Sequence, residues 1–514
     1  MNENLANNLS ITWCNIAALV VVVVLLLVAV FCEAQLPKSE MSLALSNIEN
    51  PEESGPLHIF KDKNKTTPNK LVFYSVHGSL FNDDPIYNKK SPLWIPVVEI
   101  VGINTSLWAY SRYITNEDFA RIGPDAWKHN IENGWEWDED NLNMNFFLHP
   151  FVGAAYFNTA RTNGYNFYES IPFVVGGSLV WEYFGENTLP SYNDIINTSL
   201  SGPLVGEMQY RLSSNILNDQ TSGSERFFRE VGAALVNPVR SANRLIFGTT
   251  ERKTDKEIYQ KEPINIAASI GARWANEGSN FGTGKGNTTV DVNLDYGYPF
   301  EYKFRNPYDY FKLWGNLYFG TGDKILNNVM GYGILYGENY QYKDMEMLIG
   351  IFQHYNYWDT STFELSSLAF GGGAITQLTL GKNKKLLTDF HLGVVPLAAH
   401  NTFNGPNNNQ LRDYNYGHGL QTELESTLKI GRLNLVFAGY YYWIRTYYQE
   451  KEDDYIGILK PRISVNLNEF LSVGFEHLIY YCDRNSDVYP HHNVTRTEQK
   501  LYVSYFFKDP WYDR

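Results

Sequence analysis

The chain has 514 residues, a formal net charge of −14 and a mean hydropathy of −0.33. The negative charge argues against nucleic acid as a partner, and the low hydropathy argues against a bundle of membrane-spanning helices. Aromatic residues make up 15% of the chain, an excess that is typical of membrane barrels with aromatic side chains at both interfaces.

The N-terminal segment contains the one long apolar run of the sequence, residues 16–31. This run is shorter than the ~20 residues that a spanning helix needs. Because the small residues Cys32 and Ala34 follow it, we predict a secretory signal peptide over residues 1–34. No Lys or Arg precedes the run, so a retained inner-membrane anchor is the alternative. The bulky Phe31 makes a lipidated cysteine the weaker interpretation.

Cleavage at this point would leave Cys482 as the only cysteine of the mature chain. A lone cysteine forms no internal disulfide and no thiolate metal site. The sequence also contains no Gly-rich nucleotide-binding pattern, no GxSxG elbow and no His-rich zinc motif. We therefore expect neither a metal nor a cofactor. Residues 35–91 are polar and irregular, which predicts a flexible periplasmic leader.

Residues 92–250 show helical periodicity and are predicted to form an α-helical subdomain. One helix should begin at His149-Pro150, because proline is favoured at the first helical position, and end near Arg161. Further helices are expected over residues 169–184, from residue 191 with a restart near residue 202, and over residues 225–236.

Residues 260–510 alternate between apolar and polar side chains, which predicts a transmembrane β-barrel. In the clearest segment Val290 and Val292 fall on one face of a strand, and Asp291 and Asn293 fall on the other. About twelve antiparallel strands are expected, over residues 264–276, 287–299, 310–320, 327–342, 346–358, 362–380, 385–400, 416–430, 433–448, 454–468, 470–483 and 496–508.

The polar faces of these strands carry charges of both signs. At the bilayer midplane an Arg or Lys facing lipid would cost ~2–4 kcal/mol, so these side chains should line the lumen. The candidate lumen-facing residues are Asp291, Asp295, Asp389, His391, Glu423, Glu425, Lys429 and Arg462. They could form an ion-paired filling that holds the barrel's shape, or they could line a conduction path or ligand site.

Several motifs of the helical subdomain carry a family resemblance. They are Phe147-Leu148-His149-Pro150-Phe151-Val152-Gly153, Tyr156-Phe157-Asn158-Thr159-Ala160-Arg161, Trp181-Glu182-Tyr183, Pro190-Ser191, Asn193-Asp194, Gly206-Glu207, Arg229-Glu230-Val231-Gly232-Ala233, Asn237-Pro238 and Phe352-Gln353-His354-Tyr355. The chain resembles, over roughly residues 93–370, an uncharacterised bacterial domain of unknown function. The resemblance implies an outer-membrane protein, and the family has no established activity to carry over.

A second similarity concerns the order of polar residues in the helical subdomain. VanZ-like small helical membrane proteins have a His that opens one helix, an acidic residue that ends the next, and a Ser-x-x-Asp stretch followed by small residues. His149, Glu182, Ser191, Asp194 and Gly202 match that order. The helices of this chain differ because they are amphipathic and not membrane-spanning.

Four residues are candidates for catalysis: His149, Glu182, Asp194 and Arg161. A carboxyl group that works as an acid or base needs a raised pKa, which burial or a neighbouring charge can provide. Each candidate also has a structural explanation. His149 can help to cap its helix, and Asp194 can cap the next helix together with Ser191. Glu182, like Glu186 four residues on, can instead pair with Arg161 or Arg211.

The sequence thus predicts an outer-membrane β-barrel of a Gram-negative cell envelope, whose helical subdomain plugs the lumen or caps its periplasmic mouth. A structural or transport role is the leading interpretation. The alternatives are an enzyme that modifies envelope lipid or glycan with His149, Glu182 and Asp194, and a binding module for an envelope partner. Outer-membrane lipids and the barrel-assembly machinery, which reads an aromatic last strand such as residues 499–507, are the expected partners, while the substrate stays open.

Overall fold

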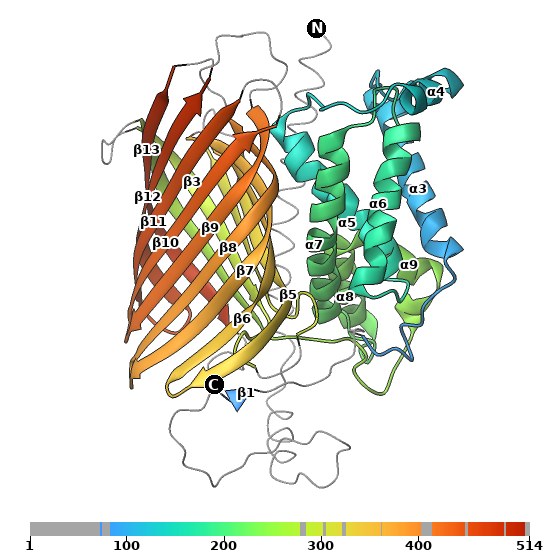
Figure 1. Cartoon of the computed structure of the whole chain (residues 1–514). Helices are drawn as coiled ribbons and strands as arrows, with labels where there is room; N and C mark the ends of the chain where they lie inside the picture. The colour runs from blue at the N-terminus through green and yellow to red at the C-terminus, as the bar shows by residue number, and fades with distance from the viewer. Residues whose placement is uncertain are drawn as a thin grey trace.

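A computed structural model of the chain describes residues 72–73, 83–277, 284–301, 305–320, 325–360, 362–401, 414–447, 451–487 and 490–508. The predicted signal peptide and most of the predicted leader lie outside the described residues. The described chain forms a block of helices and a β-barrel, which stand side by side (Figure 1).

The barrel is closed by twelve antiparallel strands, as the alternation predicted. Each strand pairs with its neighbours in sequence, and β13 pairs with β2 to close the ring. The strands are β2 (Ile264–Glu277), β3 (Lys285–Tyr296), β4 (Phe311–Phe319), β5 (Leu326–Tyr342), β6 (Met345–Asp359), β7 (Glu364–Gly381), β8 (Lys384–Asn401), β9 (Tyr414–Ile430), β10 (Leu433–Thr446), β11 (Glu452–Asn466), β12 (Leu471–Ser486) and β13 (His492–Lys508). A two-residue strand, β1 (Val72–Phe73), pairs with the end of β5.

The two ends of the barrel can be told apart by their connections. At one end residues 343–344, 382–383 and 431–432 join β5 to β6, β7 to β8 and β9 to β10, and the longer segment 297–310 joins β3 to β4; at the other end residues 402–413 join β8 to β9. We call these the turn end and the loop end. The last strand, β13, runs towards the turn end, because it is antiparallel to β12, which starts there.

The helical block contains α3 (Trp94–Tyr110) with η1 (Ser111–Thr115), α4 (Pro124–Glu132), η2 (Met144–Leu148), α5 (His149–Arg161), α6 (Phe167–Phe184), α7 (Tyr192–Ile216), α8 (Gly223–Val236), α9 (Pro238–Ile246) and η3 (Thr249–Glu251). The predicted start of α5 and the cap of α7 at Ser191 are present. Among the described helices, none has both the length and the apolar character that a membrane crossing requires.

Helix α7 is continuous through Gly202 and Pro203, where the sequence suggested a restart. Its continuity follows from packing, because Gly202 faces Gly153 of α5 so closely that a Cβ on either residue would overlap the backbone of the other helix. A proline inside a helix removes one backbone hydrogen bond. The close contact between α5 and α7 compensates for this loss and makes α7 the central element of the block.

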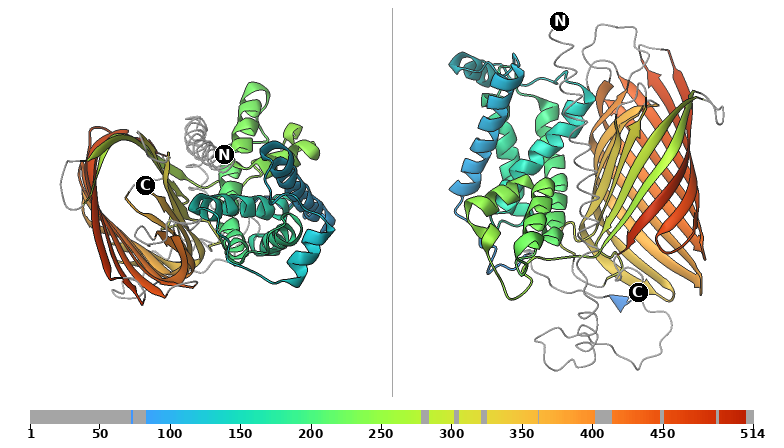
Figure 2. Two further views of the ribbon diagram at one scale, coloured as in Figure 1. Left: turned by 90° about the horizontal axis from the view of Figure 1, so that it is seen from above. Right: turned by 180° about the vertical axis from the view of Figure 1, so that it is seen from behind.

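The helical block packs against the outer surface of the barrel wall, as the view from above shows (Figure 2). Along β6, Gln353, Tyr355 and Tyr357 point outwards, and the side chain of Gln353 donates a hydrogen bond of 2.5 Å to the carbonyl oxygen of Leu200 in α7. Tyr355 donates to the carbonyl oxygen of Phe146. The predicted positions of the block, as a plug in the lumen or a cap over the periplasmic mouth, are therefore wrong.

A buried ionic network joins the block to the barrel. The Glu207 carboxylate of α7 pairs with Arg161 Nε at 2.7 Å and with Arg211 Nε at 3.0 Å. Arg211 also pairs through Nη1 with Asp309, which lies between β3 and β4, at 2.8 Å. All four side chains are almost completely buried. Because a buried charge without its partner is costly, this network should hold the block in one position on the wall.

We expect Glu207→Gln to destabilise the protein by about 3 kcal/mol or more, because it leaves two buried guanidinium groups short of one negative charge. Thermal unfolding in detergent, and protease cleavage between the block and β2, would measure the effect. The matched control is Glu225→Gln, which removes a half-exposed partner of Arg229 and should change stability little. A Glu207→Gln protein as stable as the control would contradict the assignment.

Candidate functional site

Three of the four predicted catalytic residues come together at the loop end of the helical block. His149 begins α5, Glu182 lies in the last turn of α6, and Asp194 lies in the first turn of α7. The Nε2 atom of His149 is 3.4 Å from Oδ1 of Asp194, and its Nδ1 atom is 3.2 Å from the hydroxyl of Thr198. The imidazole therefore bridges two successive turns of α7.

Local capping positions the carboxylates of this site. The backbone N–H of Asp194 donates to the hydroxyl of Ser191, and the backbone N–H of Ser191 donates to Oε2 of Glu182 at 2.8 Å. The structural explanation for Ser191, as the cap of α7, is therefore correct. The same cap brings the end of α6 to the start of α7 and fixes Glu182 beside Asp194.

The site is buried and acidic, which changes the protonation of its carboxyl groups. Burial, and then the charge of Asp194, raises the pKa of Glu182 to about 8. Burial, and then the charges of Asp138 and Asp140, raises the pKa of Asp194 well above its ordinary value. Glu182 therefore holds a proton near neutral pH, as a group that donates or accepts protons must.

Arg161 does not belong to this site, because it lies in the ionic network with Glu207 and stacks over the ring of Tyr210 at 4.0 Å. The predicted pairing of Glu182 or Glu186 with Arg161 or Arg211 is wrong, since both arginines bind Glu207.

Asn130 and Thr198, like the acidic residues Asp138 and Asp140, lie near the site and were not singled out from the sequence. The side chain of Asn130 in α4 donates to the carbonyl oxygens of Glu182 and Glu186, and Thr198 binds His149. Thr198 follows Asp194 by four residues, so helical spacing could have identified it. Asn130 could not be identified, because no helix was predicted at α4.

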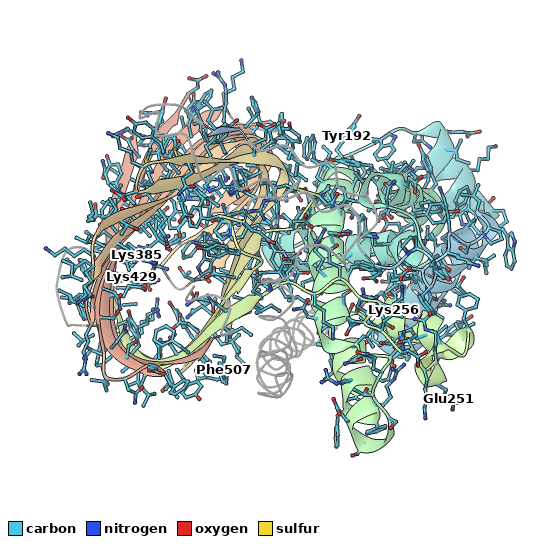
Figure 3. All side chains as sticks on the ribbon, turned by 90° about the horizontal axis from the view of Figure 1, so that it is seen from below. Tyr192, Glu251, Lys256, Lys385, Lys429 and Phe507 are labelled. Atoms are coloured by element: carbon cyan, nitrogen blue, oxygen red, sulfur yellow. The ribbon has the colours of Figure 1, made fainter. Side chains whose placement is uncertain are left out.

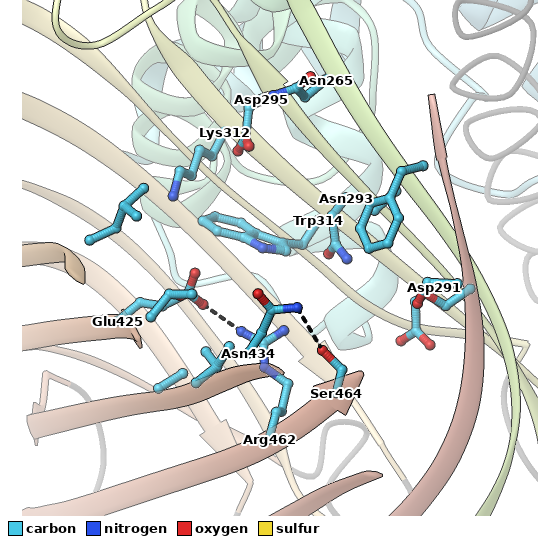
Figure 4. Close-up of a pocket in the computed structure, with 18 of the residues that line it drawn as sticks. Asn265, Asp291, Asn293, Asp295, Lys312, Trp314, Glu425, Asn434, Arg462 and Ser464 are labelled. Carbon is cyan, nitrogen blue, oxygen red and sulfur yellow. Dashed lines mark hydrogen bonds and ion pairs between the residues drawn. The ribbon is translucent and has the colours of Figure 1, made fainter. Parts of the chain in front are cut away.

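The lumen of the barrel contains a polar cavity of about 550 Å³ at the turn end. Seen from below, Lys385 and Lys429 point into it (Figure 3). Six of the eight predicted lumen residues line this cavity: Asp291, Asp295, Asp389, Glu425, Lys429 and Arg462. Several of these charges form ion pairs on the inner face of the barrel. Arg462 Nη2 is 2.7 Å from Glu425 Oε2 (Figure 4), and Lys500 Nζ is 2.9 Å from Asp291 Oδ1.

The remaining two predicted residues, His391 and Glu423, are cross-strand neighbours that lie closer to the loop end. Glu423 Oε2 is 3.3 Å from His354 Nδ1, and the ring of His391 packs against Tyr332 with the ring centroids 4.5 Å apart. Both side chains are buried, so they belong to the packed interior of the barrel and do not line the cavity.

The loop-end half of the lumen is filled by apolar and aromatic side chains, which we call the lumen core. The lumen core contains Met330, Trp358, Phe363, Leu365, Ala369, Val395, Ala398, Tyr442, Ile444, Ile456, Ile458, Leu478, Tyr480 and Cys482. Phe363 stacks on Tyr480 with ring centroids 4.3 Å apart. The cavity at the turn end therefore has a closed floor of packed side chains.

One group of potential metal ligands, His400, Asp454 and Cys482, comes together among the described residues. The guanidinium group of Arg484 lies against it, with Nε 2.7 Å from Asp454 Oδ1. The second ring nitrogen of His400 is 2.9 Å from the hydroxyl of Tyr480. A cation would have to displace the positively charged Arg484, so these groups fit an ion-paired cluster better than a metal site.

A model of a known protein family matches part of the helical block. Residues 134–239 match the model of a family described as "Domain of unknown function (DUF3943)". The predicted resemblance to a domain of unknown function is confirmed over this range, and the similarity to VanZ-like proteins stays a prediction. No curated protein is significantly similar to the chain.

Solved structures of outer-membrane channels show a distant likeness to the barrel. The NanC porin is 10% identical, with a TM-score of 0.27, over 46% of this chain and 98% of its own. The outer membrane channel DcaP of Acinetobacter baumannii is 9% identical over 47% of this chain and 96% of its own, with a TM-score of 0.22. The toluene transporter TodX of Pseudomonas putida is 9% identical over 48% of this chain and 89% of its own, with a TM-score of 0.20. The strand pairing alone establishes the barrel.

The protein should lose stability as the pH rises from about 5 to about 8, and Glu182→Gln should reduce this loss. The folded protein keeps a proton on Glu182 that the unfolded chain releases, because the pKa is raised from 4.5 to about 8. This stabilisation is complete below the unfolded pKa and disappears as the pH passes the folded one.

Thermal midpoints measured at intervals across this range would test the expectation. Glu132→Gln, at an exposed position of α4, is the matched control and should follow the wild type. A wild-type midpoint that does not change with pH would contradict the raised pKa, as would an equally steep loss in Glu182→Gln.

Proposed function

We propose that the protein is an outer-membrane β-barrel that anchors the helical block and does not conduct solutes through its lumen. Large apolar side chains on the outer surface of the barrel support the location: Ile270, Ile351, Leu392, Val394, Ile463 and Leu501 are all exposed. Charged residues lie on the opposite, inner face of the same strands, which is the arrangement that lipid requires. The three two-residue turns favour the turn end as the periplasmic side.

The lumen core is the observation that carries the proposal. Its fourteen side chains are almost completely buried, and they fill the loop-end half of the lumen from several strands at once. Protein interiors packed in this way contain few voids larger than a water molecule. A solute that entered the cavity from the periplasmic side would meet this layer and stop, which favours an anchoring role over transport.

The wild-type protein should give no steady conductance in a planar bilayer. The double variant W358A/Y480A should conduct, because it removes two large aromatic side chains from the lumen core and opens a gap in the seal. Tyr441→Ala, which removes an aromatic side chain from the exposed outer face, is the matched control and should stay silent. A wild-type protein with the lasting conductance of an open pore would contradict the proposal.

The loop-end site favours a second candidate function, acid–base chemistry on an envelope lipid or glycan. Glu182 would hold the proton, and His149, paired with Asp194, would be the base. The loop end would face away from the periplasm, so the substrate class would be a lipid or glycan of the outer leaflet. Convergence of the three side chains from three different helices is the observation that supports this candidate.

Glu182→Gln and His149→Ala should alter the lipid or glycan profile of the outer membrane while the barrel still folds. Mass spectrometry of the extracted envelope would detect the change, and heat-modifiable gel mobility would show that folding is intact. Glu132→Gln serves again as the control, since it removes a carboxylate from the surface of the same block. Profiles identical to the wild type in both folded variants would rule this candidate out.

A further inference from the structure

Helices α8 and α9 expose large apolar side chains at the turn end of the block. On α8 these are Phe227, Phe228, Val231 and Leu235, and on α9 and the residue after it they are Leu245, Ile246 and Phe247. Ile246 is 73% exposed and Phe228 is 57% exposed. Contiguous apolar surface of this kind usually marks a binding surface for a protein or a membrane.

Apart from Glu225, which is 57% exposed, the charged side chains of the same two helices are mostly buried and paired. Arg226 Nη2 lies 2.8 Å from Asp219, and Arg244 Nη2 lies 2.7 Å from Glu230 and 3.1 Å from Asp219. This flank of the block is therefore ionic inside and apolar outside. Charges that face the interior and pair with one another are typical of protein segments in contact with lipid.

A groove of about 700 Å³ runs between α8 and α9. Phe227, Val231, Ala234 and Leu245 form its apolar part, and the exposed Lys253 lies at its rim. Glu251 and Lys256, on either side of this rim in sequence, lie on the side of the block away from the barrel (Figure 3). The charged lining of the groove consists of the cations Arg226, Arg252 and Lys253 and the anions Glu230 and Glu251, so it is positive by one charge. An apolar groove with a positive balance of charge has the shape and charge of a site for an acyl chain next to a phosphate.

The depth of this flank agrees with lipid contact. Asn215, at the end of α7, donates to the carbonyl oxygen of Glu262, just before β2, so α8 starts at the turn end of the barrel. On the barrel wall Ile349 and Ile351 of β6, close to the same end, are exposed and apolar. The apolar surface of the barrel and that of α8 and α9 therefore lie near the same end of the molecule.

We propose that α8 and α9 bind phospholipid of the periplasm-facing leaflet, with an acyl chain in the α8–α9 groove and the headgroup phosphate at Lys253. This inference rests on the outer-membrane location proposed above. Amphipathic helices with Phe and Leu on one face and charges on the other lie in this way at the membrane interface. The site would fix the helical block to the lipid as well as to the barrel.

Photo-crosslinking in intact outer membranes tests the proposal. The photoreactive amino acid p-benzoylphenylalanine would replace Phe228 or Ile246 on the flank, Leu392 on the outer face of β8, or Lys128 on the exposed surface of α4. After irradiation, mass spectrometry of the full-length protein would identify phospholipid adducts. We expect adducts at positions 228, 246 and 392, and none at position 128.

The outcomes separate the two proposals. Adducts at Leu392 without adducts at Phe228 and Ile246 would overturn the lipid site and leave the outer-membrane location intact. Crosslinks from positions 228 and 246 to protein, either a second copy or another chain, would also overturn it. If position 392 gave no phospholipid adduct either, the result would contradict the proposed outer-membrane location.

The groove has its own test. With p-benzoylphenylalanine at position 227 inside the groove, Ala234→Trp should abolish the phospholipid adduct, because the indole fills the space between the helices. The adduct at position 246 should persist in the same variant. Lys253→Glu should reduce adducts with phosphatidylglycerol in vesicles that contain it. Adducts at position 227 that survive Ala234→Trp would overturn the groove as the acyl-chain site.

Discussion

The arrangement of this protein depends on one buried carboxylate, that of Glu207. It binds two arginines of the helical block, and one of them, Arg211, continues to Asp309 beside the barrel. Removing these charges from water costs several kcal/mol per ion, which is offset only when every charge has a partner in good geometry. The network therefore tolerates one position of the block on the wall, and the other interfaces follow from that position.

The outer surface of the barrel carries polar side chains that bind the helical block. On β6, Gln353 and Tyr355 point towards what would be lipid in an isolated barrel, yet both donate hydrogen bonds to backbone carbonyl oxygens of the helices. On β9, the hydroxyls of Tyr414 and Tyr416 accept from the side-chain amide of Asn145 and donate to the backbone carbonyl oxygens of Asp140 and Asp138. A polar group without a partner in lipid costs several kcal/mol. These strands are therefore adapted to a protein neighbour along part of the wall.

Some strands carry polar side chains on both faces, and this limits which parts of the structure the sequence predicts. Strands and their number follow from alternation, and the starts of α5 and α7 follow from Pro150 and Ser191, because these signals act within a few residues. The position of the block depends on partners far apart in sequence, such as Gln353 and Leu200. The signal was present in β6, where Gln353 and Tyr355 alternate with His354 and not with apolar residues. Alternation distinguishes only a face towards the lumen from a face towards lipid. It does not predict a face that contacts another part of the protein.

The lumen core was missed for a related physical reason. In β10, Tyr440, Tyr441, Tyr442 and Trp443 follow one another. Both faces of the strand are therefore apolar or aromatic, and the alternation loses its contrast.

The carboxylates of the loop-end site could be predicted as candidates from the sequence. Their convergence could not, because it depends on the angle between α6 and α7 at the Ser191 cap.

The loop-end site and the apolar flank of α8 and α9 lie at opposite ends of α7. The loop-end site lies at its first turn, and α8 follows its last turn, so its 25 residues place about 37 Å between them. The two features therefore lie at opposite ends of the helical block. A lipid held by α8 and α9, as we propose, could not reach Glu182 across this distance. The proposed anchor and the proposed chemistry at the loop end therefore use different ends of the block.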